Sequence, residues 1–485
     1  MRKLLLSLLL LPGPLSAAPF YAAAGKADIT PDLEKETVWL AGFGAKGRRP
    51  EGVHDPLYAR AVVVSDGKRT AALVAVDLLG LYRADVEEIR RSLGWTGGDR
   101  SLFLVATHTH SGPDTLGLWG RWLGVSGVDR RYQRRVRETV AALVRDLASR
   151  MQEADLAYAR ADLDPRGLSR DLRDPVVIDP ELAALSLRDR KGKAIGSLVR
   201  WSCHPEALGR ENRQVSADFP GALCARIEEA TGGACVFLPG AVGGLLSPDT
   251  EEGLSVAGEY AAMERIGRRL ADEALRALRG APRRAGGEVS FASRTVRIPV
   301  ENSRYLAFLP SLAFGHELQN RDGHALGAWR RWWLPLRHVL FYPLRSDLRP
   351  WIETEVSLLR IGRIAVLGLP GELFPELALG GYGGEFRFGH PLVGPSNPNP
   401  PDLKKAPAGP YLRALLGKEG LLVGLANDEI GYIVPEYDFQ TAPTRTMLPR
   451  PPGTHYEETN SIGRSAAPLL LDAARELLSS SPLPR

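Results

Sequence analysis

Apolar runs with the composition of β-strands recur along the chain and alternate with segments of helical periodicity. The runs are Ala61–Val64, Thr70–Val76, Leu102–Ala106, Ala194–Trp201, Ala234–Leu238 and Ile364–Leu369. Several are apolar at nearly every position, which is typical of strands buried on both faces of a sheet. We therefore predict an α/β fold in which mixed β-sheets are flanked by helices.

Three segments have the spacing of amphipathic helices. Apolar side chains recur at helical intervals from Tyr132 to Leu147 and from Met263 to Leu278, and Gly280 ends the second segment. A last helix is expected at residues 465–478. Residues 395–410 are rich in Pro, Asn and Gly and residues 441–453 in Pro and Thr, so we expect surface loops there. The composition does not change beyond either loop, so we expect one large domain over residues 19–485.

The N-terminus has the features of a secretory signal. Arg2 and Lys3 precede an apolar stretch from Leu4 to Leu11, and small residues follow at 16–18. This stretch is shorter than the roughly 20 apolar residues of a membrane-spanning helix. We therefore expect residues 1–18 to be a signal peptide and the mature protein to be secreted or periplasmic.

Charge and composition exclude two classes of protein. The formal net charge is +5, but the sequence has no basic run with interleaved aromatics, so we expect no nucleic-acid partner. The mean hydropathy of −0.15 excludes a polytopic membrane protein. Three cysteines are too few for a disulfide framework, although a single bridge from Cys224 to Cys235 remains open.

The segment Thr107–Pro113, with the sequence THTHSGP, is the strongest local signal for chemistry. It follows the apolar run that ends at Ala106. On an extended chain, His108 and His110 would project to the same side, because successive side chains alternate. Two converging imidazoles can bind a transition metal, and two hydrogen-bonded structural histidines are the alternative.

Three other apolar runs are also followed by a group that can bind a metal. His204 follows the run that ends at Trp201, Glu372 follows the run 364–369, and Asp77 follows the run that ends at Val76. Open α/β sheets bind ligands at the ends of their strands. Two histidines and a glutamate are the protein ligands of many catalytic zinc sites, which keep one position open for water.

An ordered set of short motifs resembles the neutral/alkaline (non-lysosomal) ceramidase family. The motifs are AGKADITP at 24–31, HDPLYARAVVV at 54–64, ATHTHSGP at 106–113, CHPE at 203–206, VSADFPG at 215–221, SPD at 247–249, PGE at 370–372, LANDEIGYI at 425–433 and YEETNSIG at 456–463. They run in family order across nearly the whole mature chain. The resemblance implies an α/β catalytic domain with a buried zinc site that hydrolyses the amide bond of ceramide.

The resemblance also implies which residues form this site. The zinc ligands would be His108, His204, Glu372 and Tyr432. The catalytic residues would be His110, Arg170 and Tyr456, where His110 acts as an acid or base and Tyr456 contacts the substrate. Arg173 is an alternative to Arg170, because the residues that flank both match the family only loosely.

The chain departs from the family pattern in two respects. It ends soon after the Tyr456 motif, so the C-terminal immunoglobulin-like domain of typical members is expected to be missing. Leu245 replaces the aspartate of the usual Gly-Asp-x-Ser-Pro turn. These differences leave the metal ligands intact and leave the acyl substrate open.

We therefore expect a zinc-dependent hydrolase that cleaves ceramide or a related N-acyl lipid by attack of a metal-activated water. A zinc amidase or esterase for another acyl substrate and a secreted non-catalytic metal-binding protein are the alternatives. Tryptophans 119, 122, 329, 332 and 333 indicate either peripheral membrane contact or ordinary packing. The sequence gives neither the acyl length nor the oligomeric state.

Overall fold

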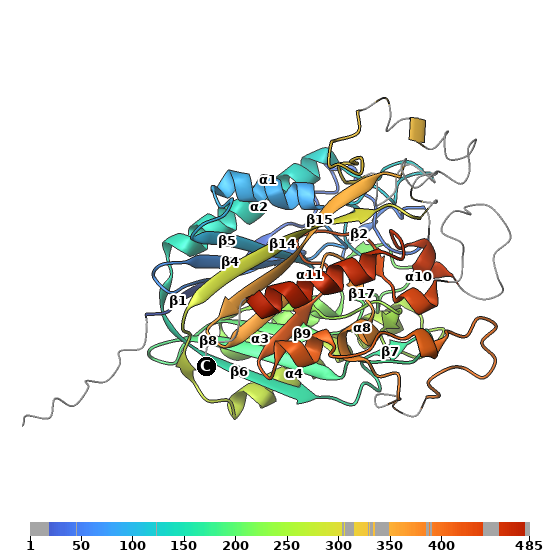
Figure 1. Ribbon diagram of the computed structural model, residues 1–485. Helices are drawn as coiled ribbons and strands as arrows, with labels where there is room; N and C mark the ends of the chain where they lie inside the picture. The colour runs from blue at the N-terminus through green and yellow to red at the C-terminus, as the bar shows by residue number, and fades with distance from the viewer. Residues whose placement is uncertain are drawn as a thin grey trace, which may run out of the picture.

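Two β-sheets packed face to face, with helices on their outer sides, make up the fold (Figure 1). The computed structural model describes residues 19–44, 46–122, 124–302, 305, 315–327, 329, 333–334, 349–384, 388, 390–439 and 455–480. The expected signal peptide and the loop predicted at 441–453 lie outside the described residues.

The larger sheet has nine strands. In spatial order they are β11 (Ala234–Pro239), β9 (Ala194–Trp201), β8 (Glu181–Asp189), β6 (Gln152–Asp162), β1 (Tyr21–Asp28), β3 (Tyr58–Ser65), β4 (Thr70–Val76) and β5 (Arg100–Ala106), with β13 (Arg284–Ala285) beside β6. The β11–β9 and β4–β5 pairs are parallel and the other pairs are antiparallel. The sheet is therefore mixed.

The smaller sheet has four strands and covers one face of the larger one. Its order is β14 (Val289–Pro299), β15 (Trp351–Ile361), β16 (Ile364–Gly368) and β18 (Gly420–Val423). Three two-stranded ladders complete the strands: β2 (Gly52–Val53) with β10 (Gln214–Val215), β7 (Arg170–Asp171) with β12 (Leu246–Ser247), and β17 (Glu372–Leu373) with β19 (Tyr432–Ile433).

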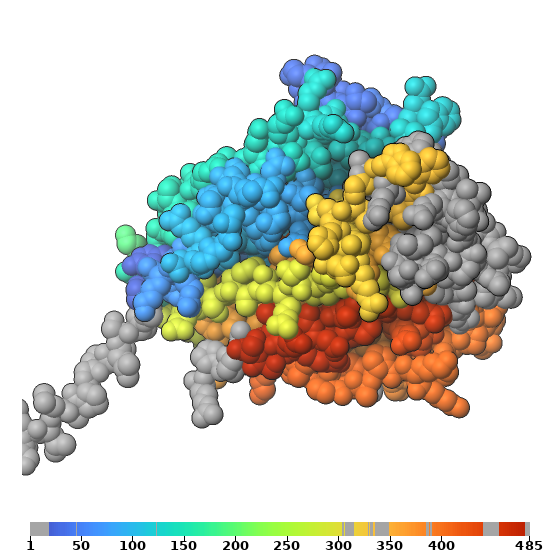
Figure 2. All heavy atoms as spheres, turned by 45° about the horizontal axis from the view of Figure 1, so that its top comes forward, coloured from blue at the N-terminus to red at the C-terminus, as the bar shows by residue number. Residues whose placement is uncertain are grey.

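Helices cover the outer faces of both sheets. They are α1 (Arg83–Leu93), α2 (Arg130–Ser149), α3 (Phe219–Thr231), α4 (Val256–Arg279), α8 (Pro375–Leu379), α9 (Leu412–Leu416), α10 (Tyr456–Thr459) and α11 (Ala466–Ser480), with short 3₁₀ turns at Leu403–Lys405 and Glu436–Asp438. Helix α2 packs on β1 and β3, and α4 packs on β6 and β8. Helix α11 lies along β14 on the far side of the smaller sheet (Figure 2).

Burial on both faces explains why the apolar runs predicted strands correctly. In β3, the side chains of Val62 and Val64 belong to the core between the two sheets, whereas Val63 belongs to the core beneath α2. Strand β4 is divided in the same way. Such a strand has no solvent face and needs no polar positions. The predicted α/β class with mixed sheets is confirmed, and the division of the chain into residues 1–18 and 19–485 stays a prediction.

The larger sheet is strongly curved, and β9 approaches β1 across the interior. Gly196 of β9 lies where a Cβ atom would overlap the Cβ of Ala24 in β1 and would lie 3.1 Å from the carbonyl oxygen of Ala234. The neighbouring backbones therefore leave no room for a side chain at this position.

We predict that Gly196→Ala lowers the free energy of unfolding by about 1–3 kcal/mol, because a methyl group would force the two strands apart. Gly280→Ala is the matched control, since no atom lies within 4 Å of the Cβ it would add. Urea titration of both variants measures the effect. Equal stability of the two variants would show that β1 and β9 are not in close contact.

Candidate metal centre

The loops that follow β5, β9 and β16 meet at one edge of the two sheets. His108 and His110 follow β5, His204 follows β9, and Glu372 begins the short strand β17 just after β16. All four residues line one cavity. The sequence rule that polar residues after buried strands converge at the edge of a sheet therefore holds for these residues.

Asp77 is the exception to that rule. It is buried after β4, but it does not line the cavity. Its Oδ2 atom accepts a hydrogen bond of 2.9 Å from the backbone N–H of Tyr58 and lies 3.9 Å from Nε of Arg60. Burial raises the pKa of Asp77 to about 6 against the opposing effect of Arg60. Asp77 therefore holds β3 and β4 together instead of joining the site.

The backbone at His108 is not extended. Its φ angle is 74°, in the left-handed region that few residues other than glycine adopt. The expectation of an extended His-x-His segment is thus wrong in its geometry, although the two rings do converge, with centroids 5.2 Å apart. Backbone hydrogen bonds from His108 N–H to Leu78 O and from Thr107 N–H to Val76 O fix this turn at 2.8 and 2.9 Å.

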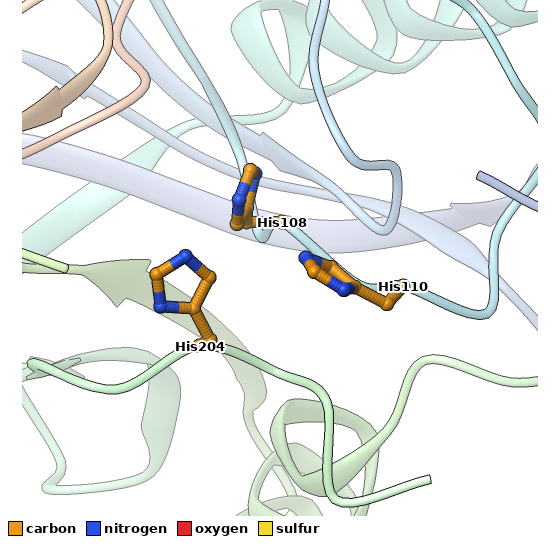
Figure 3. Close-up of side chains that lie close together, drawn as sticks. All are labelled: His108, His110 and His204. Atoms are coloured by element: carbon orange, nitrogen blue, oxygen red, sulfur yellow. The ribbon is translucent and has the colours of Figure 1, made fainter. Parts of the chain in front are cut away.

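The imidazoles of His108 and His204 both point their Nε2 atoms at one carboxylate oxygen. Glu372 Oε2 lies 2.8 Å from Nε2 of His204 and 3.6 Å from Nε2 of His108. Figure 3 shows these two rings together with that of His110, and one nitrogen of each of the three lies within 4.8 Å of the others. Ligand atoms about 2.0–2.1 Å from a tetrahedral metal ion are themselves about 3.3 Å apart, and the two distances from Glu372 Oε2 lie on either side of this value.

The other nitrogen of each of these two rings is held by the backbone. Nδ1 of His108 lies 2.7 Å from Leu79 O, and Nδ1 of His204 lies 3.0 Å from Leu246 O. A carbonyl oxygen can only accept a hydrogen bond, so Nδ1 of each ring carries a hydrogen and Nε2 is the nitrogen that can bind a metal ion. Protein metal sites commonly fix their histidine ligands in this way. The donor set fits a divalent metal ion such as Zn²⁺.

Tyr432 lies beside Glu372, as the sequence resemblance implied. The two residues are paired in the parallel ladder of β17 and β19, and both line the cavity. The Tyr432 side chain is buried, at 5% exposure, and its ring lies edge-on to that of Tyr456. The four residues expected to bind zinc therefore all line one cavity, while their role as ligands stays a prediction.

The neighbouring histidines keep Glu372 ionised. Burial opposes ionisation of Glu372, but the neighbouring His108 and His204 hold the pKa of Glu372 far below its usual value. Burial lowers the pKa of His204, but the hydrogen bond and the negative charge of Glu372 raise it, and the net value is about 9. Burial and the rings of His108 and His204 keep the pKa of His110 well below its usual value, so His110 is neutral at pH 7.

Glu206 is a site residue that the sequence reasoning missed. Its Oε2 atom lies 3.3 Å from Nδ1 of His110, and its Oε1 atom accepts a hydrogen bond from the Ser247 hydroxyl. Arg48 fixes the same loop by donating to the carbonyl oxygens of His110 and Ala41. The position of Glu206, two residues after His204 in the CHPE motif, was the available signal.

The cavity has a volume of about 350 Å³ and walls of mixed character. Its apolar wall is formed by Phe43, Leu79, Leu116, Leu118, Trp119, Leu172 and Leu245. Gly42 lets the loop approach the site, because a Cβ atom there would lie 2.7 Å from Cβ of His110.

Tyr456 and Arg170 occupy different positions relative to this cavity. Tyr456 lines it and is 54% exposed, so it stands at the mouth. Arg170 pairs with Ser247 across the ladder of β7 and β12, and its side chain does not line the cavity. Arg173, the alternative, is engaged by Asp438 at 2.7 Å and Glu457 at 3.1 Å. Catalytic roles for Arg170 and Tyr456 stay predictions.

A third carboxyl group, that of Glu429, also lines the cavity and was not picked out from the sequence. Burial, and secondly the negative charge of Glu372, raise the pKa of Glu429 well above its usual value.

The three cysteines take no part in the site. All are buried and unbridged, so the bridge between Cys224 and Cys235 that the sequence left open is not formed.

The fold and the donor set define an α/β protein with a candidate metal centre at the base of an apolar cavity. Comparison of sequences then shows which family the chain is similar to. Residues 20–247 match the sequence model of neutral/alkaline non-lysosomal ceramidase, N-terminal. The resemblance inferred from the motifs is confirmed.

Individual ceramidases are similar to this chain as well. The chain is 26% identical over 239 residues to the neutral ceramidase of Pseudomonas aeruginosa and 24% identical over 231 residues to that of Mycobacterium tuberculosis. These matches cover 45% and 43% of this chain but only 35% and 36% of the relatives. The matching segment thus spans about a third of the length of the curated relatives.

Solved structures share the fold over nearly the whole chain. The crystal structure of neutral ceramidase from Pseudomonas aeruginosa superposes with a TM-score of 0.65 at 19% identity, covering 96% of this chain and 76% of that one. A ceramidase complexed with C2 gives a TM-score of 0.64 at 18% identity, with the same coverage. At these identities, the likeness establishes the fold.

We predict that the purified protein binds one Zn²⁺ or Co²⁺ ion per chain and that His204→Ala weakens binding by more than about 100-fold. Loss of outer-shell partners alone costs about 10–100-fold, and a ligand contributes more. His324→Ala is the control, because His324 is exposed. Calorimetric titration and metal analysis give the result, and full zinc content in His204→Ala would exclude this centre.

Proposed function

We propose that this chain is a zinc-dependent hydrolase that cleaves the amide bond of ceramide or a related N-acyl lipid. One observation carries the proposal: two imidazole Nε2 atoms converge on the buried Glu372 carboxylate at the base of an apolar-walled cavity. The resemblance to the ceramidases supports the choice of substrate.

The residues that would hold the metal are His108, His204, Glu372 and Tyr432. A zinc ion bound there would supply Lewis-acid chemistry, polarising a carbonyl group and making water acidic enough to attack near neutral pH. The protein contributes a fixed set of donors, because the backbone carbonyls of Leu79 and Leu246 orient the two rings.

His110 is the residue proposed to carry a proton. It is neutral at pH 7, so it can take a proton and then give it to the leaving amine, which leaves poorly unless it is protonated. Oε2 of Glu206 lies 3.3 Å from Nδ1 of His110, so Glu206 would orient the His110 ring and stabilise the charged form of that ring. The two residues together form the acid–base pair of the proposed mechanism.

The cavity would hold the acyl part of the substrate. Its leucines, with Phe43 and Trp119, bury apolar surface and exclude water from the reacting bond. At the mouth, Tyr456 would donate its hydroxyl hydrogen to the substrate carbonyl. Leu245, at the position where the family has aspartate, extends the apolar wall.

Peripheral membrane contact and export belong to the same proposal. Trp122 and Trp329 are 60% and 75% exposed, and Lys46 lies over the Trp122 ring, which suits a lipid surface. Trp332 lies outside the described residues. No helix in the described part of the chain is long and apolar enough to cross a bilayer. We propose a secreted or periplasmic location from the N-terminal sequence.

The direct test is hydrolysis. We expect the zinc-loaded protein to release fatty acid from a short-chain labelled ceramide, to lose activity when a chelator removes the metal, and to regain it with added zinc. His108→Ala should lower the rate at least about 100-fold, whereas the control His324→Ala should not change it.

The substrate panel separates the alternatives. Cleavage of acyl esters without cleavage of any amide would indicate the esterase alternative. Bound zinc with no turnover of ceramide, N-acyl amines or esters would indicate a metal-containing binding protein and would contradict the proposal.

A second prediction concerns the acid–base pair. Glu206→Gln should lower kcat about 10–100-fold with little change in KM, because it weakens the orientation of His110 but leaves the metal ligands in place. Zinc content and melting temperature should stay at the wild-type level. Glu211→Gln, an exposed glutamate nearby, is the matched control. A wild-type kcat in Glu206→Gln would remove Glu206 from the mechanism.

A further inference from the structure

The loop between β18 and β19 presents Glu429 to the cavity in a fixed position. Asn427, at φ 62°, accepts a hydrogen bond of 2.8 Å from Leu104 N–H and donates one of 2.9 Å to the Ser357 hydroxyl. The loop is thereby tied to strands of both sheets. Its backbone cannot shift without breaking these buried bonds.

The neighbouring Asp428 ties the loop to a third region. One of its carboxylate oxygens accepts hydrogen bonds from Arg83 N–H at 2.9 Å and from Nε2 of His316 at 2.8 Å. The other accepts a hydrogen bond of 2.7 Å from the Thr354 hydroxyl. Asp428 is therefore fully used in holding the loop, and Glu429 is the acidic residue of this loop that faces the cavity.

The carboxyl group of Glu429 is only half satisfied. Its Oε1 atom accepts a hydrogen bond of 2.7 Å from Gly431 N–H. Its Oε2 atom is buried and has no hydrogen-bonding partner among the described residues, within which no cationic side chain pairs with Glu429 either. A buried polar group without a partner costs about 1–3 kcal/mol, so it needs an explanation.

The surrounding wall is shaped to admit this side chain. Gly80 lies against it, and a Cβ atom at Gly80 would come within 3.1 Å of Cγ of Glu429. Glu429 lines the same cavity as the proposed metal ligands His108, His204 and Glu372. It is not one of the four residues that the family resemblance names as ligands, so its free oxygen is open to another partner.

We propose that Glu429 determines substrate specificity by hydrogen-bonding a hydroxyl group of the substrate, so that the cavity takes N-acyl amino alcohols in preference to N-acyl amines that lack a hydroxyl. A hydroxyl group can donate to Oε2 or accept from it, which satisfies the buried oxygen that the surrounding side chains leave unpaired. Sites built around such a buried group discriminate strongly against analogues without the hydroxyl. The proposal rests on the proposed function for its substrate class.

The test uses equilibrium binding, which does not require turnover. The ligands are a short-chain N-alkylsulfonyl amino alcohol, whose sulfonamide resists hydrolysis, and the same compound without its hydroxyl groups. We expect the zinc-loaded wild-type chain to bind the hydroxylated compound at least about 10-fold more tightly. In Glu429→Met this preference should fall below about 3-fold, with little change for the compound that lacks hydroxyls.

The matched control is Glu436→Met, which changes an exposed glutamate of the following turn and should keep the wild-type preference. Equal affinity of the wild-type chain for the two compounds overturns the proposal without any variant. Equal weakening of both compounds in Glu429→Met also overturns it. Preference for the hydroxylated compound in a chain that hydrolyses no amide would contradict the proposed function and leave the role of Glu429 standing.

Discussion

The site depends on how neighbouring side chains stabilise the negative charge of one buried glutamate, Glu372. Glu372 is 7% exposed, and a carboxylate in that position is tolerated only when it is paired and hydrogen-bonded. Its partners, His108 and His204, come from loops that follow different strands of the larger sheet, whereas Glu372 follows a strand of the smaller sheet. The charge of Glu372 is therefore paired only when the two sheets are packed against each other in one register. The centre forms only in the complete fold.

Placing His108 beside Glu372 requires strain in the backbone of His108. His108 adopts a left-handed backbone that an L-residue takes at a cost of about 1–3 kcal/mol. The cost is offset by backbone hydrogen bonds at Thr107 and His108 and by Arg48, which holds the carbonyl of His110. Strained residues that persist in this way cluster at functional sites, because the surrounding contacts determine their conformation more strongly than the local preference does.

The sequence predicts the parts of the fold that depend on local pattern. The strands β3, β4, β5, β9 and β11 are mostly apolar because they are buried on both faces. Strands β6 and β14 mix buried with exposed positions and carry several charged residues, so their composition resembled that of loops. Convergence at the strand ends was predictable for His108, His204 and Glu372, but the left-handed turn at His108 has no signature in a sequence without glycine there.

Neighbouring residues in one loop show why the remaining site residues could not be read from sequence. Asp428 and Glu429 are adjacent acids, both about 2% exposed. Burial would raise the pKa of Asp428, but the contact with His316 and two hydrogen bonds lower it below its usual value. Glu429 has no such cation, and its pKa is raised. The difference comes from which distant side chains reach each carboxyl, so one acid holds the loop while the other keeps an oxygen free at the cavity wall.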